Sequence, residues 1–193
     1  PPAEYYQTVW ICCNPWMTKN LDVDTYRNGD AIPKVTDPSA WAALTTGAYC
    51  YYNNDSINYA AVYGKLYNGY AINDPRGLAP EGWHVPTDLE WTTFENCLGG
   101  SSLAAGPMKE IGTSHWNSPN TDATDLSGFK ALPGGIRWDT GVFSSIQSDG
   151  HWWSSTNKSS VELWFRNAHY NSSILDRYYL NMRFGFSIRC IRD

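Results

Sequence analysis

The cysteines and histidines are the side chains best suited to nucleophilic or metal chemistry, and their spacing favours neither. Five cysteines are an odd number, so at least one thiol stays free or pairs between molecules. Adjacent Cys12 and Cys13 cannot bridge each other without strain, so we expect at most one of them in a long-range disulfide. No Cys-x-x-Cys, His-Glu-x-x-His, Ser-His-Asp order or glycine-rich phosphate loop occurs. The residues concerned are Cys12, Cys13, Cys50, Cys97, Cys190, His84, His115, His151 and His169.

Oxygen ligands gather loosely in one polar stretch. Asn117, Asn120, Asp122 and Asp125 could offer the hard oxygens that calcium prefers. Loops rich in Asn and Asp more often form plain turns, and this is the interpretation we prefer. We therefore expect no cofactor, with calcium as the less favoured alternative. The sequence does not identify a carboxylate pair for glycosidase chemistry, because two such residues can be far apart in the sequence and close only in the folded structure.

The last third of the chain mixes large aromatic with small hydrogen-bonding residues, which suits recognition. Residues 141–184 hold nine Ser and nine Phe, Trp or Tyr. Antibody paratopes share this composition, because rigid aromatics give contact area at low entropic cost and Ser or Asn adapts its hydrogen bonds. We expect some aromatics to pack in the core, namely Trp152, Trp153, Trp164 and Tyr170. The expected binding surface is Asp139, Phe143, Ser145, Ser148, His151, His169, Ser172, Ile174, Asp176, Tyr178, Tyr179, Asn181 and Phe184.

Part of this set should form a single exposed patch, because Asp and His are costly to bury without partners. We expect convergence on that patch from His169, Ser172, Asp176, Tyr178, Tyr179 and Phe184.

The charge balance restricts the partners and the location. Acidic residues outnumber basic ones by 19 to 14, and the net charge of −5 argues against a nucleic-acid ligand. No apolar run approaches the ~20 residues needed to span a bilayer. Residues 1–4 do not resemble a signal peptide, so any export signal is expected to have been removed or to lie upstream. Sparse charge with abundant Asn, Ser, Gly and Tyr is typical of secreted surface proteins, so we expect an extracellular protein.

Short helices must help to position these side chains. Asp37-Pro38 predicts a helix start, with Asp at the N-cap and Pro at the first helical position. Residues 87–90 (TDLE) form a capping box in which Thr87 and Glu90 cap each other's amides. The apolar residues that follow at helical spacing end at Gly99-Gly100. A weaker helix is expected over residues 103–111, interrupted by Gly106-Pro107.

The sequence pattern predicts short strands separated by turns in the rest of the chain. Val161, Leu163 and Phe165 alternate in polarity with their neighbours, as does the segment from Phe186 to Cys190. We therefore expect the final strand to be half-buried in a sheet. The pattern predicts an α+β fold with small antiparallel sheets, two or three helices and long ordered loops. At 193 residues, the chain fits a single domain over 1–193.

Residues 81–91 (EGWHVPTDLEW) are the most specific stretch and resemble the core motif of the Fibrobacter succinogenes major paralogous domain family. Two departures stand out. Residues 11–15 (ICCNP) replace a Gly-Thr-Gln-like stretch, so the adjacent cysteines have no inherited role, and Gly69 stands where Trp is common, which we expect to loosen packing. Further matches cover nearly the whole chain, at residues 16–21, 26–33, 47–50, 63–68, 127–135, 152–156 and 185–190.

The resemblance implies a C-type-lectin-like fold, of the branch shared with formylglycine-generating enzymes. That fold implies a small twisted antiparallel sheet, neighbouring N- and C-terminal strands, and long loops on one face, where binding usually resides. The related enzymes bind copper through two cysteines in the C-terminal half, which here holds only Cys190. We expect Cys190 to be a buried structural residue and the protein not to be an enzyme.

Domains of this family also occur as variable proteins of diversity-generating retroelements in phages and bacteria. There, mutagenesis at adenines converts Asn codons of a repeat into codons for other residues. The resemblance thus implies a variable binding region at about 136–185. Seven residues are reachable from an Asn codon, namely His169, Ser172, Ile174, Asp176, Tyr178, Tyr179 and Phe184. Trp138, Gln147, Lys158, Glu162 and Met182 are not reachable, so we set them aside.

The sequence therefore predicts a ligand-binding module of receptor or adhesin type, on a bacterial cell surface or a phage tip, with a protein or glycan ligand. One rival is a structural surface lipoprotein domain whose aromatics serve stability alone. The other rival is an enzyme related to formylglycine-generating enzymes. Exposed aromatics would favour binding over the first rival, and a deep pocket with convergent titratable groups would favour the enzyme.

Overall fold

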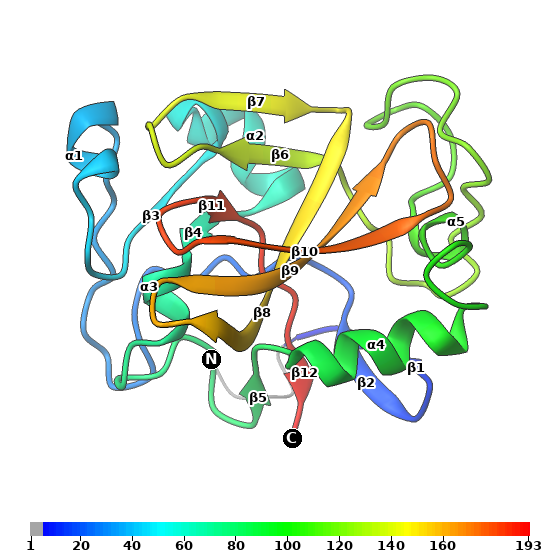
Figure 1. The fold of residues 1–193 in the computed structure, drawn as a ribbon, viewed down its shortest axis with the longest axis horizontal. Coiled ribbons are helices and arrows are strands. Elements are labelled where there is room, and N and C mark those ends of the chain that lie inside the picture. The colour runs from blue at the N-terminus through cyan, green and yellow to red at the C-terminus, as the bar shows by residue number, and fades with distance from the viewer. Residues whose placement is uncertain (1–5) are drawn as a thin grey trace.

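The described residues fold into three small antiparallel sheets joined by short helices and long loops (Figure 1). The computed structural model describes residues 6–193. In order across each sheet, the first contains β1 (Thr8–Ile11), β2 (Asn14–Met17), β12 (Ile191–Arg192) and β5 (Trp83–His84). The second contains β10 (Leu175–Asn181), β9 (Glu162–His169) and β8 (Asp149–Ser159). The third contains β3 (Tyr49–Cys50), β4 (Leu66–Asn68), β11 (Gly185–Phe186), β6 (Gly134–Arg137) and β7 (Phe143–Ile146). The predicted α+β class is therefore confirmed.

Two helices, α1 (Pro38–Ala42) and α4 (Asp88–Cys97), begin where the capping signals predict, and the described residues form five α-helices rather than the expected two or three. Asp37 accepts a 2.7 Å hydrogen bond from the Ala40 amide at the start of α1. The predicted capping box is present at α4, where the Glu90 amide donates to Thr87 and the Thr87 amide donates to Glu90. Gly99 and Gly100 follow α4 with positive φ, so they end it without the steric cost of a side chain. The helices are α1 (Pro38–Ala42), α2 (Ser56–Tyr63), α3 (Gly69–Ile72), α4 (Asp88–Cys97) and α5 (Ala105–Met108), with a short 3-10 helix at Tyr52–Asn54.

Strands from the two ends of the chain lie side by side, as the resemblance implies. In β12, Ile191 pairs with Trp16 of β2 on one side and with His84 of β5 on the other. His84 also forms ion pairs with Glu90 and Asp193. The segment that enters α4 is thereby fixed to the C-terminal strand.

The longest strands form the β8–β9–β10 sheet. β8 spans eleven residues, and its register with β9 shifts between Trp153 and Asn157. The β6–β7 hairpin and α4 lie on opposite sides of the β9–β10 hairpin (Figure 1). This hairpin carries most of the residues that the sequence nominates for binding.

Tryptophan dominates the interior. Trp16 packs against Trp91 and Phe94 with ring centroids 4.8 and 5.0 Å apart. Trp152 and Trp153 are fully buried, which confirms their expected packing role. Trp153 also donates its indole N–H to the Tyr67 carbonyl at 3.0 Å, so the buried polar atom has a partner. Trp164 and Tyr170 are only half-buried.

The final segment is buried on both of its faces, so the expectation of a half-buried strand is wrong. Phe186, Ile188 and Cys190 are inaccessible as expected, but Ser187 and Arg189 between them are buried as well. Arg189 can be buried because its guanidinium donates to the carbonyls of Met17 and Phe129 and to the side chain of Asn20. Internal hydrogen-bond acceptors thus take the place of solvent on the face of the segment that the alternating sequence pattern predicts to be exposed.

Two smaller expectations also need correction. The weak helix over residues 103–111 is reduced to the four residues of α5, which include Gly106 and Pro107, and it ends because Lys109 adopts an extended conformation. Gly69 does not loosen its surroundings. A Cβ there would lie 2.8 Å from Leu163 and 2.9 Å from the Met182 backbone, so neighbouring residues already fill the space.

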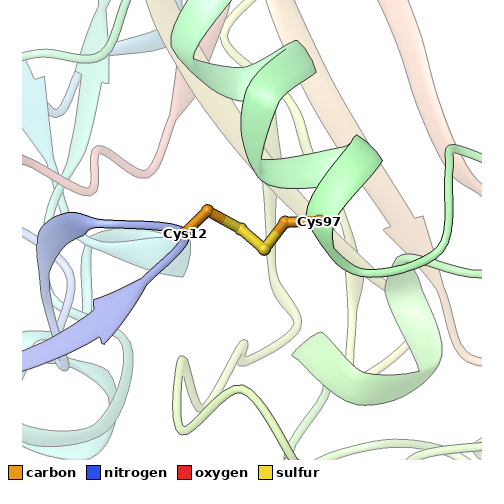
Figure 2. The surroundings of a disulfide bond; sticks show 2 residues. All are labelled: Cys12 and Cys97. Atoms are coloured by element: carbon orange, nitrogen blue, oxygen red, sulfur yellow. A yellow bond between two sulfur atoms is a disulfide. The ribbon is translucent and has the colours of Figure 1, made fainter.

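One disulfide joins the β1–β2 turn to the end of α4, from Cys12 to Cys97 (Figure 2). It closes a separation of 85 residues, and such long loops gain most from a cross-link. Cys13 is exposed and free, while Cys50 and Cys190 are buried and free. The expectation that at most one of the adjacent cysteines is bridged is confirmed.

We predict that Thr87→Ala lowers the free energy of unfolding by ~1 kcal/mol, because the Glu90 amide loses its side-chain cap. Chemical denaturation measures this value. Thr93→Ala in the same helix is the matched control, since that hydroxyl bonds the Leu89 carbonyl inside the helix and caps nothing. Equal losses in the two variants would show that the cap is not the cause.

We also predict that thiol titration of the denatured, unreduced protein finds three free thiols per chain, those of Cys13, Cys50 and Cys190. Cys97→Ser should raise the count by one, because it releases Cys12. A count of one in the unmodified protein would mean that a second disulfide forms.

Candidate functional site

The β9–β10 hairpin divides the nominated binding residues between two faces. Tyr178 lies opposite Phe165, and Tyr179 lies opposite Trp164. Consecutive residues of a strand point to opposite faces, and the ring contacts follow this rule. The Phe165–Tyr178 centroids are 6.2 Å apart and the Trp164–Tyr179 centroids 5.2 Å apart. A single patch containing both tyrosines is therefore ruled out by the pleat of the strand.

Polar groups line the Tyr178 side from the β6–β7 hairpin to β10. The Trp138 indole donates to Ser144 at 2.7 Å, and the Ser144 and Ser145 hydroxyls lie 3.5 Å apart. The Ser145 carbonyl accepts a 3.1 Å hydrogen bond from the Ser148 amide, in the turn that leads to Asp149. His169 Nδ1 lies 2.6 Å from Asp149, and its Nε2 lies 3.3 Å from Asp176. We call these residues the polar row: Trp138, Ser144, Ser145, Asp149, His169 and Asp176.

His169 is the charged centre of the polar row. Both ring nitrogens face carboxylates, an arrangement that stabilises the imidazolium ion. The hydrogen bond to Asp149 is the main cause that raises the pKa of His169, and Asp176 adds to it while burial opposes it. Burial acts to raise the pKa of Asp149, but the bond to His169 and the charge of the neighbouring imidazoles lower it overall.

Two residues expected at the binding surface are buried beneath it. His151 is 8% exposed and stacks on Phe186 with centroids 4.8 Å apart. Burial lowers the pKa of His151 to about 4, so the ring is neutral at neutral pH and fits an aromatic core. Phe184 is 6% exposed and packs between Trp138 and Phe186. Both residues support the surface from below.

Several nominated residues do lie beside the polar row. Ile174 and Tyr178 are 45% and 54% exposed, and Tyr178 follows Asp176 on the same side of β10. Ser172 is half-buried in the turn after His169, and its hydroxyl accepts from the Ile174 amide. Ser148 adjoins Asp149 and accepts a 3.0 Å hydrogen bond from Asn117.

Other nominated residues lie apart from the polar row. Tyr179 and Asn181 belong to the opposite side of β10, and Asn181 accepts from the Arg183 amide. Phe143 is half-buried against Tyr52, and Asp139 is half-buried in the turn after Trp138.

Residue-type reasoning missed three members of the polar row. Trp138 was set aside on codon grounds, and Ser144 and Asp149 were not nominated. No local pattern identifies Asp149, because its partner His169 is 20 residues away and only the β8–β9 register brings them together.

The opposite side of the hairpin carries a second surface, the stem patch, made of Lys158, Trp164, Arg177 and Tyr179. The Arg177 guanidinium lies 3.5 Å from the Trp164 ring centroid. Lys158 lies 5.5 Å from the same ring and 5.4 Å from that of Tyr179. These are cation–π distances, and they hold the long side chains against the aromatic rings. Trp164 thus packs mainly against exposed neighbours.

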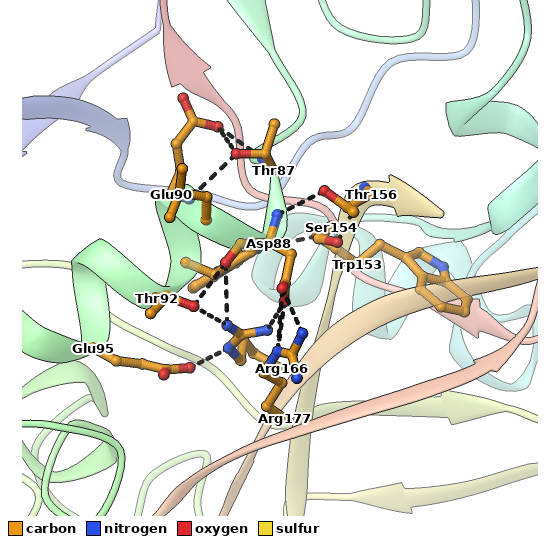
Figure 3. Close-up of polar contacts among 12 residues, drawn as sticks. Thr87, Asp88, Glu90, Thr92, Glu95, Trp153, Ser154, Thr156, Arg166 and Arg177 are labelled. Carbon is orange, nitrogen blue, oxygen red and sulfur yellow. Dashed lines mark hydrogen bonds and ion pairs between the residues drawn. The ribbon is translucent and has the colours of Figure 1, made fainter. Parts of the chain in front are cut away.

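A buried ion network attaches the hairpin to α4 (Figure 3). Arg166 is inaccessible to solvent, and its guanidinium pairs with Asp88 at 2.7 Å and with Glu95. It also donates to the Thr92 hydroxyl at 3.1 Å. Arg177 reaches both oxygens of Asp88. Burial acts to raise the pKa of Asp88, yet the hydrogen bonds from the two arginines lower it overall.

In the polar loop considered for calcium, the Asn120 and Asp125 side chains form hydrogen bonds with main-chain groups of nearby residues. Asn120 donates to the carbonyls of Glu110 and Gly112, and Asp125 accepts from the Lys130 amide. Asn120 and Asp125 have positive φ, which Asn and Asp tolerate in turns. Within residues 6–193, no three His, Cys, Asp or Glu side chains are placed to hold a metal ion.

One hollow in the described part of the chain is an open groove of about 600 Å³. Its walls come mainly from residues 17–20 and 22–25, before α1. Asp22 in this wall is paired with Lys65 at 2.8 Å. The groove and the polar row are thus formed by different parts of the chain.

NMR titration should place the pKa of His169 above, and that of His151 below, the ordinary value near 6.5. Asp149→Asn should lower the pKa of His169, because it removes the main partner of the imidazolium. His84 is the internal control. Burial acts to lower its pKa, but Asp193 and Glu90 raise it overall, and the variant leaves both in place.

The same pairing makes stability depend on pH. The folded pKa of His169 is raised, so its contribution is fully present below about pH 6.5 and is lost as the pH rises through the folded value. The stability difference between the unmodified protein and Asp149→Asn should therefore shrink from about pH 6 to pH 9. A difference that stays constant would contradict the assigned charge.

The described part of the chain contains no helix long and apolar enough to cross a membrane. A search of curated proteins and a search of solved structures each gave no match. The family model described as the Fibrobacter succinogenes major domain matches residues 9–192, which include all elements of the site. The chain therefore belongs to the Fibrobacter succinogenes major domain family.

Proposed function

We propose that this protein is a ligand-binding module of receptor or adhesin type that acts outside the cytoplasm, on a bacterial cell surface or a phage virion. The polar row is the observation that carries the proposal. It combines hydroxyl, carboxylate and imidazole groups with the exposed rings of Trp138 and Tyr178. Mixed aromatic and polar groups are typical of protein interfaces, and a protein or a glycan could use them.

A C-type-lectin-like fold, of the branch shared with formylglycine-generating enzymes, is part of the proposal. The neighbouring terminal strands and the long loops around the β8–β9–β10 sheet support it. In this interpretation the sheet supplies the scaffold, and the loops and the exposed side of β10 supply recognition.

Diversification by a retroelement is a further part of the proposal. Ile174, Tyr178 and Tyr179 are reachable from Asn codons and are 45–54% exposed, so replacing them would disturb little packing. The flanking DNA tests this. A reverse-transcriptase gene beside a near-copy of the 3′ end of this gene, differing at adenines, is the expected arrangement.

A binding role is preferred over the two rivals for separate reasons. Against the enzyme stands Cys190, which is fully buried, and burial raises its pKa to about 12, so its thiolate is strongly disfavoured. Against the structural domain stands the position of exposed Tyr178 and Ile174 beside the polar row, since exposed apolar groups next to polar ones are typical of interaction sites.

Arrays of glycans and of bacterial surface proteins test the binding role. We expect Ile174→Ala/Tyr178→Ala to lose array binding and to keep its stability within roughly 0.5 kcal/mol per site. Ile57→Ala/Leu89→Ala is the matched control, because both residues are exposed on helices α2 and α4. It should keep both binding and stability. Phe184→Ala should instead cost ~3 kcal/mol, since Phe184 is core. Equal array binding by both double variants would overturn the assignment of the surface.

A further inference from the structure

Lys109 is a fully buried cation whose hydrogen bonds go only to main-chain carbonyls. Its ammonium donates to the carbonyls of Thr121 at 2.8 Å, His169 at 3.0 Å and Ser172 at 2.9 Å. An ammonium group has three N–H donors, so these bonds use all of them. Burial lowers the pKa of Lys109 to about 8, opposed by the charge of Asp122. A buried charge of this kind is costly, so its geometry points to a specific task.

The contrast with Lys65 makes the arrangement clear. Lys65 is also buried, but it forms an ion pair with the Asp22 carboxylate at 2.8 Å. Lys109 instead joins the loop at Thr121 to both sides of the turn between β9 and β10. Its own backbone is fixed by hydrogen bonds with Ala105 and Asp125. The ammonium thus acts from a rigid support.

Main-chain bonds also hold the rest of the turn over residues 169–175. The Tyr170 amide donates to Ser148, and the Tyr170 carbonyl accepts from Thr121. Further along, the Ser173 carbonyl accepts from the Ala105 amide and the Leu175 amide donates to the Ser101 carbonyl. One side-chain bond from outside also reaches this part of the turn, between Ser173 and Asp122. Asn171 and Ile174 are exposed, and the Ser172 hydroxyl accepts a hydrogen bond from the neighbouring Ile174 amide.

We propose that Lys109 is the positioning residue of the polar row: it fixes the main chain of the β9–β10 turn, and with it His169, whatever side chains the turn carries at 171, 172 and 174. A carbonyl is present at every residue, so a donor that binds carbonyls does not read side-chain identity. The same bond to the His169 carbonyl holds the imidazole between Asp149 and Asp176. The inference goes beyond the proposed function, because it concerns the geometry of the turn and holds for any ligand.

Lys109→Met tests the proposal through amide hydrogen exchange measured by NMR. The Tyr170 and Leu175 amides should exchange roughly tenfold faster or more, while the α4 amides keep their protection, because only the turn opens. The pKa of His169 should fall toward its ordinary value as the ring leaves its carboxylates. Loss of the lysine charge alone would raise that pKa, so the direction separates positioning from simple electrostatics.

Two further variants complete the test. Lys65→Met, the loss of a buried lysine elsewhere, should leave both turn amides and His169 unchanged. The triple variant Asn171→Ala/Ser172→Ala/Ile174→Ala should also leave the exchange of the turn amides and the pKa of His169 unchanged. This variant still tests the proposal if Lys109→Met does not fold. Unaltered exchange in Lys109→Met, or a turn that opens in the triple variant, would overturn the proposal. Ligand binding enters none of these measurements, so their failure is distinguishable from failure of the proposed function.

Discussion

Arg166 is a buried cation. The position of the β9–β10 hairpin, which carries much of the candidate site, depends on the carboxylates that pair with this cation. A buried guanidinium without partners would be strongly destabilising, so acceptors must be brought to it. Asp88 and Glu95 supply them from one side of α4. Asp88 is the first residue of that helix, so the capping box at Thr87 sets its position. A local signal at a helix start thereby determines where the β9–β10 hairpin attaches.

The same contact decides which surfaces of the hairpin are open. α4 packs against the hairpin on the side that carries Arg166, and the same side carries the stem patch around Trp164. The pleat sends Asp176 and Tyr178 to the other side, where the β6–β7 hairpin provides Ser144 and Ser145. The polar row is therefore assembled from strands that belong to two different sheets. Phe184, Phe186 and His151 fill the space beneath it, so the surface rests on an aromatic core.

Buried cations recur wherever long loops must be ordered. Loop carbonyls lack the partners that helices and sheets provide, and each buried one needs a donor. Arg189 supplies donors to Met17 and Phe129, and Arg137 supplies them to Val35, Thr36 and Gly141. Lys109 does the same for the turn that carries His169. A chain with short helices can thus present ordered loops, because a few side chains with several donors each join distant carbonyls.

The sequence by itself determined the local features and the kind of fold. Capping at Asp37 and Thr87, the burial of Trp152 and Trp153, and the α+β class all depend on nearest neighbours or on residue type. The tertiary structure alone decided the composition of the site. The contact of His169 with Asp149 depends on strand register, and the burial of His151 and Phe184 depends on rings from other segments. A residue's type gives the cost of burying it, but whether a partner removes that cost is settled only when distant segments meet.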